Sequence, residues 1–181
     1  MPALSIFAEL VRLEVPTVFG ASIDTVAAAM ARERPDAVLC IGQAGGRSAV
    51  TPERVAINLM DATIADNAGV IPVDQPVICG GENALFSTLP VKAMVRAIQA
   101  AGVPAQLSCS AGTFVCNQLL YGVLDLCRHR YSSTRAGFIH VPFLPEQAEK
   151  YPGRPGMPLD QMVTALEAAL ACIVRECART E

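Results

Sequence analysis

The chain has 181 residues, 52% of them apolar, and its 14 Lys and Arg against 17 Asp and Glu give a formal net charge of −3 at pH 7. That length supports one well-buried core and is short for two, so we expect a single domain over residues 1–181. The mildly acidic balance, with no run of Lys or Arg, lacks the electrostatic footprint of a nucleic-acid binder and favours a small-molecule or peptide substrate.

Strand-like and helical patterns alternate along the chain. Residues 3–15 are ambiguous, because their apolar residues fit both a helix and a strand. After them, continuous apolar runs predict strands buried on both faces of a parallel sheet, and apolar residues at helical spacing predict helices. In chain order we expect a helix over 23–34, strands over 37–42 and 55–59, a helix over 89–101, a strand over 105–109, a helix over 116–129, a strand over 136–142 and a helix from 159 to about 179.

Strands that alternate with helices of this length imply a parallel-rich sheet with helices on both faces. We therefore expect an α/β fold, specifically a three-layer α/β/α sandwich with a mostly parallel central sheet. Such sheets bind their ligands at the C-terminal ends of the strands, so a site is expected in the loops there. Two further loops, residues 72–83 and 146–158, contain several Pro and Gly and are expected to be ordered turns or a mobile cover.

Neither end of the sequence predicts export or membrane insertion. The N-terminus has no basic segment followed by an apolar stretch and a small-residue cleavage site. The most apolar C-terminal stretch, residues 168–174, is far shorter than the roughly 20 residues that span a bilayer. We expect a soluble, cytoplasmic protein that has neither a membrane nor a nucleic acid as its partner.

The seven cysteines form an odd set with no Cys-x-x-Cys pair, and the chain has two histidines. This pattern does not support a zinc site, and no metal or other cofactor is expected. A free cysteine in apolar surroundings behaves as a small hydrophobe, so most of the thiols are expected to be reduced core residues. A reactive cysteine has to differ from the others in its surroundings.

One cysteine occupies a position that favours reactivity. In residues 110–117, Ser-Ala-Gly-Thr-Phe-Val-Cys-Asn, a predicted strand has just ended, Gly112 permits a sharp turn and Cys116 opens the next helix. The amides and the dipole at a helix N-terminus favour a thiolate, and the same N–H groups can stabilise an oxyanion. We expect Cys116 to be a nucleophile with a depressed pKa; the alternative is a buried and inert thiol.

A cysteine nucleophile needs a general base, and the two histidines differ in their positions. His140 lies near the end of the predicted strand 136–142, where an imidazole can reach a cysteine at another strand end. The alternative for His140 is a hydrogen-bonded core histidine. His129 lies among arginines at a helix end and is interpreted as a solvated cation.

A Cys–His pair usually needs a third group that holds the imidazole in its productive tautomer. Glu53 is one candidate because it directly precedes the predicted strand 55–59. Glu82 and Glu146 are others, in loops where they could equally be solvated. Spacing alone does not choose among the three carboxylates.

Four motifs in order resemble those of one known family. They are Gly-Gln-Ala-Gly-Gly-Arg at 42–47, Pro-Glu-Arg-Val-Ala-Ile-Asn at 52–58, Ala-Gly-Thr-Phe-Val-Cys-Asn at 111–117 and Gly-Phe-Ile-His-Val-Pro at 137–142. The family is pyrrolidone-carboxylate peptidase, or pyroglutamyl peptidase I. The resemblance implies a Rossmann-like fold, commonly a homotetramer, and a cofactor-free thiol protease whose partners are peptides with an N-terminal pyroglutamate. The chain would then be a hydrolase of the omega-peptidase type, which removes the N-terminal pyroglutamyl residue from these peptides.

The resemblance also implies roles for particular residues. The family's nucleophile falls on Cys116, its histidine on His140 and its glutamate on Glu53, which makes the choice that spacing leaves open. Cys116 would attack the pyroglutamyl carbonyl while His140 accepts the thiol proton, and water would then release pyroglutamate from a thioester. Gln43 and Phe114, beside matched motif residues, are candidates for the pocket that holds the small lactam ring.

Two features of the sequence depart from the family pattern. Family members usually begin with a strand and a Thr-Gly-Phe-x-Pro-Phe-Gly-Gly loop, whereas this sequence starts almost at what resembles the second strand, so the first strand, loop and helix lack a counterpart here. Thr63 and Ala65 stand where the family usually has arginine and proline. These departures motivate two alternatives: a catalytically weak relative that acts as a binding or scaffold protein, and a thiol amidase for another small N-acyl group.

Overall fold

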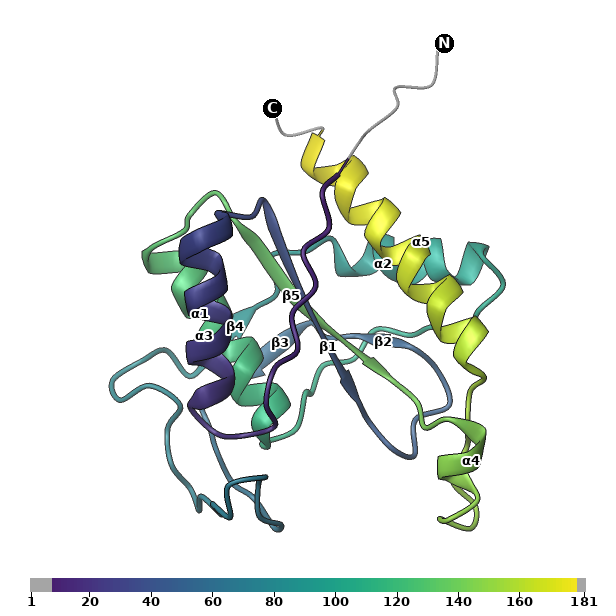
Figure 1. The fold of residues 1–181 in the computed structure, drawn as a ribbon, viewed down its shortest axis with the longest axis horizontal. Helices are drawn as coiled ribbons and strands as arrows, with labels where there is room; N and C mark the ends of the chain where they lie inside the picture. The colour runs from purple at the N-terminus through teal and green to yellow at the C-terminus, as the bar shows by residue number, and fades with distance from the viewer. Residues whose placement is uncertain (1–7, 179–181) are drawn as a thin grey trace.

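The computed structural model describes residues 8–178 of the chain (Figure 1). Five helices and five strands of very different lengths make up the regular structure of that part. In chain order they are α1 (Ala21–Glu33), β1 (Ala37–Gln43), β2 (Thr51–Pro52), β3 (Val55–Ile57), β4 (Ala84–Phe86), α2 (Val91–Ala100), α3 (Val115–His129), β5 (Arg135–Val141), α4 (Pro145–Ala148) and α5 (Leu159–Ala178).

The central sheet has the strand order β1-β5-β2. Its longest pairing is parallel, between β1 and β5, and the register runs from Ala37 opposite Arg135 to Gln43 opposite Val141. The short strand β2 pairs with β5 in the antiparallel sense, and β3 and β4 form a separate antiparallel pair. Only residues 44–50 connect β1 to β2, which is too short for the crossover that a parallel arrangement requires. The sheet is therefore mixed rather than mostly parallel.

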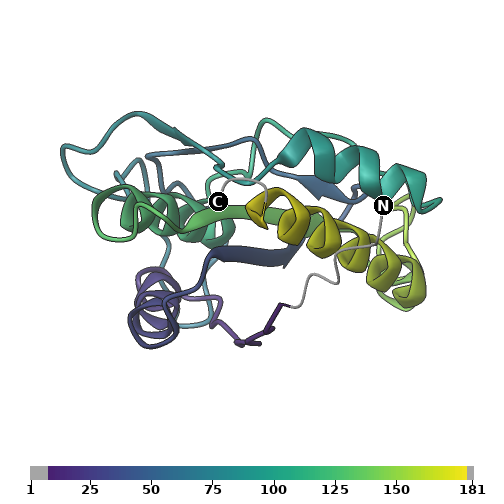
Figure 2. The ribbon, with the colours of Figure 1, turned by 90° about the horizontal axis from the view of Figure 1, so that it is seen from above.

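Side chains alternate along β1 and β5 between two hydrophobic cores. On one face, Cys40 and Phe138 belong to the core formed with α1 and α3. On the other face, Leu39 and Ile139 belong to the core formed with α2 and α5. Figure 1 shows these two helix pairs on opposite sides of the two strands, and Figure 2 shows α1 and α2 separated by them. The α/β fold with three layers is confirmed.

The predicted helices are present with boundaries shifted by at most two residues, although the expected end of the last helix near residue 179 lies outside the described residues. Strong stop signals explain the agreement. The helix α1 ends at Glu33, and its C-cap residue Arg34 adopts a left-handed conformation with φ 48° directly before Pro35. The described part of the ambiguous segment, residues 8–15, is neither helix nor strand, and residues 3–7 of it lie outside the described residues.

The predicted strand over 105–109 is wrong as a continuous strand. The segment runs parallel to residues 50–54 but makes only isolated bridges, from Ala105 to Val50 and from Ser108 to Glu53. The neighbouring residue Pro52 has no N–H to donate, so the ladder is interrupted between the two bridges. The segment still serves to place Ser108 beside Glu53.

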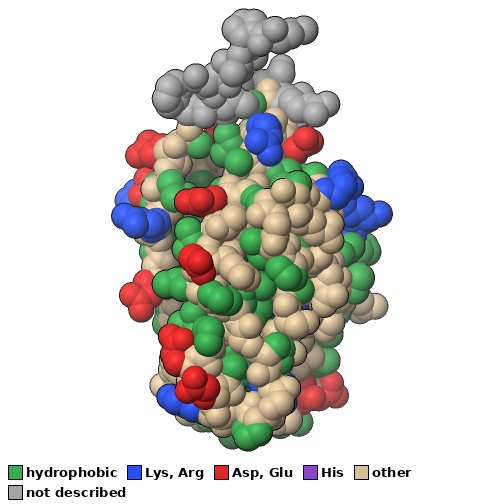
Figure 3. Space-filling view, turned by 90° about the vertical axis from the view of Figure 1, so that its right-hand side faces the viewer, with side chains coloured by type: hydrophobic (Ala, Val, Ile, Leu, Met, Phe, Trp, Pro, Cys, Tyr) green, Lys and Arg blue, Asp and Glu red, His purple; other side chains and the backbone are tan. Residues whose placement is uncertain are grey.

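None of the helices within residues 8–178 is both long and apolar enough to cross a membrane. All seven cysteines are free, and no three potential metal-binding side chains of the described residues gather in one place. On the face formed by α5, Lys and Arg side chains lie apart from one another among polar and apolar groups (Figure 3).

A buried amide joins the β3–β4 pair to the helix α3. Asn117 is completely buried; its Oδ1 accepts a hydrogen bond from the backbone N–H of Ile57 at 2.9 Å. Its Nδ2 donates to the carbonyl oxygens of Ile57 at 2.9 Å and Leu59 at 3.0 Å. The first turn of α3, which contains Cys116, is thereby fixed to β3.

We expect Asn117→Ala to lower the free energy of unfolding by about 2–4 kcal/mol, because it leaves buried backbone groups without partners. Urea unfolding followed by circular dichroism measures the change. Asn67→Ala, at an exposed position, is the matched control and should change stability by less than about 0.5 kcal/mol. Equal stability of the two variants would contradict the anchoring role of Asn117.

Candidate active site

The predicted nucleophile lies in the first turn of α3. The turn before the helix contains Gly112 with φ 79°, and Phe114 is the N-cap, so Cys116 is the second helical residue. The backbone N–H groups of this first turn have no partner within the helix, as at any helix N-terminus. Cys116 is half-buried. The sequence therefore placed this cysteine correctly.

The register of β1 and β5 brings His140 close to the thiol. His140 is opposite Gly42 across the parallel pair, and a Cβ atom on Gly42 would lie 3.0 Å from the sulfur of Cys116. The same atom would lie 2.8 Å from the ring of Phe138, whose centroid is 4.6 Å from that of His140. A glycine is needed in β1 at this point because the thiol and the aromatic ring occupy the space of a side chain.

Of the three candidate carboxylates, Glu53 is the one that contacts His140. Its Oε1 lies 2.7 Å from Nδ1 of His140, and both side chains are almost fully buried. Glu82 forms a surface ion pair with Arg128, and Glu146 is exposed. Glu53 therefore has the position that an orienting carboxylate requires.

The protonation of this pair follows from the surroundings of the carboxylate. Burial alone would raise the pKa of Glu53, but hydrogen bonds from His140, Ser108 and Arg47, together with the charge of Arg47, lower it below its ordinary value. An ionised carboxylate can only accept, so Nδ1 of His140 carries the hydrogen. In the neutral form of the ring this leaves Nε2 as the acceptor, the nitrogen that can act as a base.

The expected depressed pKa of Cys116 is wrong. Burial raises the pKa of this thiol to about 11, and the negative charge of Glu53 adds to the rise, whereas the charge of Arg47 partly offsets it. The helix N-terminus favours the thiolate, but desolvation is the larger effect at this half-buried position. The thiol is therefore protonated in the resting protein.

The two predicted pocket residues differ in their contacts. The ring of Phe114 meets the ring of Phe19 edge to face, with centroids 5.3 Å apart, just before the helix turn that contains Cys116. The amide of Gln43 instead donates to Oε1 of Gln147 in α4 at 2.6 Å. Phe19 has no distinguishing signal in the sequence apart from the glycine that follows it.

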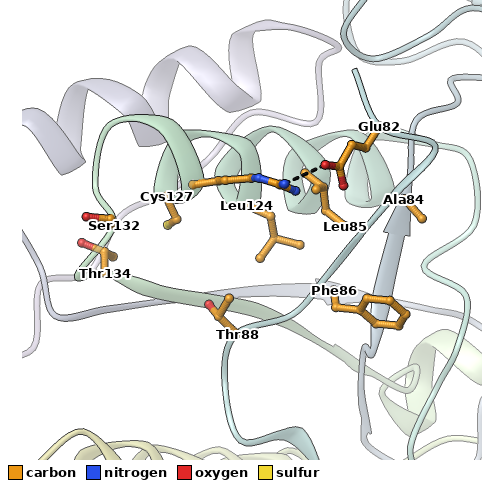
Figure 4. A pocket seen from close by; sticks show the side chains of 10 residues that line it. Glu82, Ala84, Leu85, Phe86, Thr88, Leu124, Cys127, Ser132 and Thr134 are labelled. Carbon is orange, nitrogen blue, oxygen red and sulfur yellow. Dashed lines mark ion pairs between the residues drawn. The ribbon is translucent and has the colours of Figure 1, made fainter. Parts of the chain in front are cut away.

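A separate cavity of about 370 Å³ lies between β4 and α3 (Figure 4). Leu85, Phe86 and Leu124 provide apolar walls, and the ion pair between Glu82 and Arg128 lies at its edge. None of the three triad candidates lines this cavity. It is therefore distinct from the site around Cys116.

Arg47 is a further residue of the site, and the sequence alone does not predict it. Its guanidinium contacts Glu53 at 2.6 Å, from the end of the 42–47 motif. A cation in a loop after a buried strand is the signal that could have suggested it. The other histidine, His129, is exposed at the end of α3, as the sequence predicted.

Comparison with known proteins gives a consistent result. The family model described as pyroglutamyl peptidase matches residues 6–176. Pyrrolidone-carboxylate peptidase of Levilactobacillus brevis is 52% identical over 174 residues, which are 96% of this chain and 85% of the relative.

Solved structures agree with the family model. Pyroglutamyl peptidase I of Bacillus amyloliquefaciens superposes with a TM-score of 0.88 at 44% identity, covering 90% of this chain and 79% of that one. A mutant pyrrolidone carboxyl peptidase of Pyrococcus furiosus superposes with a TM-score of 0.86 at 34% identity, covering 90% and 80%. The resemblance noted in the sequence is confirmed, and the chain belongs to the pyroglutamyl peptidase family.

Proposed function

We propose that this chain is a cysteine omega-peptidase that removes N-terminal pyroglutamyl residues from peptides, with Cys116 as nucleophile, His140 as general base and Glu53 as the orienting carboxylate. The observation that carries the proposal is the buried 2.7 Å contact between His140 Nδ1 and Glu53 Oε1, next to a cysteine in the first turn of a helix. Family membership supports the substrate class, since the curated relatives are named pyrrolidone-carboxylate peptidase.

The reaction begins from the protonated thiol of Cys116, whose pKa is raised by burial. Nε2 of His140 accepts the thiol proton as the sulfur of Cys116 bonds to the pyroglutamyl carbonyl carbon, and Glu53 stabilises the resulting imidazolium. The N–H groups at the head of α3 stabilise the oxyanion. The imidazolium then protonates the departing amine, which leaves a thioester. Water, deprotonated by His140, cleaves the thioester and frees pyroglutamate and the thiol.

The ring of the substrate needs apolar walls and a few fixed polar partners. Phe114 provides an apolar surface two residues before the nucleophile, and its edge-to-face contact with Phe19 holds its ring. Gln43 lies at the C-terminal end of β1 and carries an amide that suits the polar atoms of a lactam. Both residues are therefore assigned to substrate binding in the proposal.

The proposal includes a cytoplasmic homo-oligomer, a tetramer by resemblance to the family. The helix α5 forms an outer face of the molecule and exposes two large apolar side chains, Leu159 and Val163. Exposed apolar side chains on one face are a common feature of subunit contacts.

Replacing the proposed nucleophile should abolish turnover. Cys116→Ser is expected to lower kcat for a pyroglutamyl arylamide by roughly 10³-fold or more, because a neutral hydroxyl is a far poorer nucleophile in a site built for a thiol. Release of the arylamine measures the rate. Cys79→Ser, at an exposed cysteine, is the control and should retain the wild-type rate. A Cys116→Ser variant with wild-type kcat would contradict the mechanism.

The raised pKa of Cys116 predicts how the thiol reacts in the absence of substrate. Because its pKa is about 11, alkylation by iodoacetamide should accelerate continuously from pH 6 to pH 10, as the thiolate fraction grows. Mass spectrometry of the peptide that contains Cys116 separates its rate from that of the exposed cysteines. A rate that levels off below pH 8 would instead indicate a preformed thiolate–imidazolium pair.

The pocket assignment predicts an effect on binding. Phe114→Ala should raise KM for the pyroglutamyl substrate roughly 10-fold, since an apolar wall of a small pocket is worth about 1–3 kcal/mol. Phe86→Ala removes an exposed phenylalanine from β4, outside the site, and should leave KM unchanged. Steady-state kinetics over a range of substrate concentrations make the comparison. Unaltered KM in the Phe114 variant would remove this residue from the pocket.

A further inference from the structure

Arg47 links three separate parts of the site. Its Nη1 donates to Oε1 of Glu53 at 2.6 Å and also contacts the hydroxyl of Thr51. Its Nη2 donates at 3.0 Å to the carbonyl oxygen of Ser110, in the loop that leads to Cys116. Thr51 in turn donates to the backbone carbonyl of His140 at 3.3 Å. One guanidinium therefore contacts the carboxylate and the loop before the nucleophile, and reaches the strand of the base through Thr51.

The negative charge of Glu53 is stabilised mainly by this guanidinium, because the carboxylate is buried and has few other partners. The side chain is 0% exposed, and its Oε2 has no hydrogen-bond partner that meets standard geometry among the described residues. Oε1 accepts from both His140 and Arg47. An ionised carboxylate buried without a cation is strongly disfavoured. Arg47 is the cation that contacts it, while its own side chain remains 24% exposed.

We propose that Arg47 is a positioning residue of the reaction, which acts through Glu53 by keeping its carboxylate ionised and aimed at His140, and which holds the Ser110 loop at the same time. This inference rests on the function proposed above. Arginine suits the role because its planar fork can donate in several directions from one place. A lysine would supply the charge but could not reproduce the same set of contacts.

The sign of the pH effect follows from the charges that face Glu53. These are Arg47 from the loop after β1, the imidazole of His140 from β5 and the thiol of Cys116 from α3; the hydroxyl of Ser108 adds a neutral partner. Removing the cation makes it easier for the coupled Glu53–His140 pair to take up a proton. The active form, which requires an unprotonated Nε2 and an ionised Glu53, is then lost at higher pH than in the wild type.

Three variants test the proposal by kinetics. Arg47→Gln should lower kcat roughly 10- to 100-fold, with a smaller change in KM. The same size of loss is found in other enzymes when a residue that orients an active-site group is replaced. In the pH profile of kcat/KM, the fall in activity on the acidic side (the acidic limb) should also move to higher pH by roughly one unit. Arg47→Lys should lower kcat but keep the acidic limb near its wild-type position. Arg32→Gln, which breaks a surface pair with Glu33, is the matched control and should change neither.

A double-mutant cycle with Glu53→Gln shows whether Arg47 acts through the carboxylate. In the Glu53→Gln background, Arg47→Gln should lower kcat by less than 3-fold, roughly, because its main partner is already neutral. If the fold-decrease in kcat of the double variant equalled the product of the two single-variant decreases, the proposal would be overturned. An acidic limb of Arg47→Gln that coincides with that of the wild type would overturn it as well.

A second readout is independent of turnover. The folded-state pKa of Glu53 is depressed, so this group stabilises the fold above its unfolded pKa, and that contribution is lost as pH falls through the folded value. The difference in Tm between wild type and Arg47→Gln should therefore be largest above the ordinary glutamate pKa of about 4.3 and narrow as the pH falls below it. A difference that is independent of pH would contradict the coupling. If the wild type hydrolysed no pyroglutamyl substrate, the proposed function would fail, and this series would still decide the role of Arg47.

Discussion

The buried contact between Glu53 and His140 is the constraint on which the rest of the site depends. The backbone holds both residues of this contact in place. His140 lies in β5, and the backbone N–H of Glu53 donates to the carbonyl oxygen of Phe138 in the same strand at 2.9 Å. Side chains of a strand alternate between its two faces, so a shift of β5 by one residue would turn the imidazole toward the other core. The site therefore requires one register of the sheet, which the hydrophobic cores on both faces maintain.

The parallel pairing of β1 and β5 explains why the chemistry gathers at one edge. The C-terminal ends of parallel strands lie together, so Gly42 and His140 are neighbours although they are far apart in the chain. Because Gly42 lacks a side chain, the thiol of Cys116 can approach the strand. The first turn of α3 contributes the thiol and its own N–H groups at this edge. Asn117 keeps that helix turn attached to β3.

Local sequence context is sufficient to place some of the candidate residues on their helices and strands. Strand ends and a helix start were enough to suggest Cys116 and His140. Glu53 could not be chosen by spacing, because its partner lies 87 residues away and only the fold brings them together. The raised pKa of Cys116 was missed for the same reason: the helix dipole is visible in the sequence, whereas burial and the charge of Glu53 arise from tertiary packing.

The carboxylate has two opposing effects in this site. In the proposed mechanism it orients His140 and stabilises the imidazolium that forms during attack, but its negative charge also disfavours the thiolate of Cys116. Arg47 offsets the second effect, because its positive charge lowers the pKa of the thiol as well as that of Glu53. Oε1 of Glu53 contacts both Arg47 and His140, so the orienting hydrogen bond is retained beside the cation. In the proposed mechanism, the cation at this place thus allows a buried glutamate to assist the cysteine nucleophile while raising the pKa of the thiol less than it would alone.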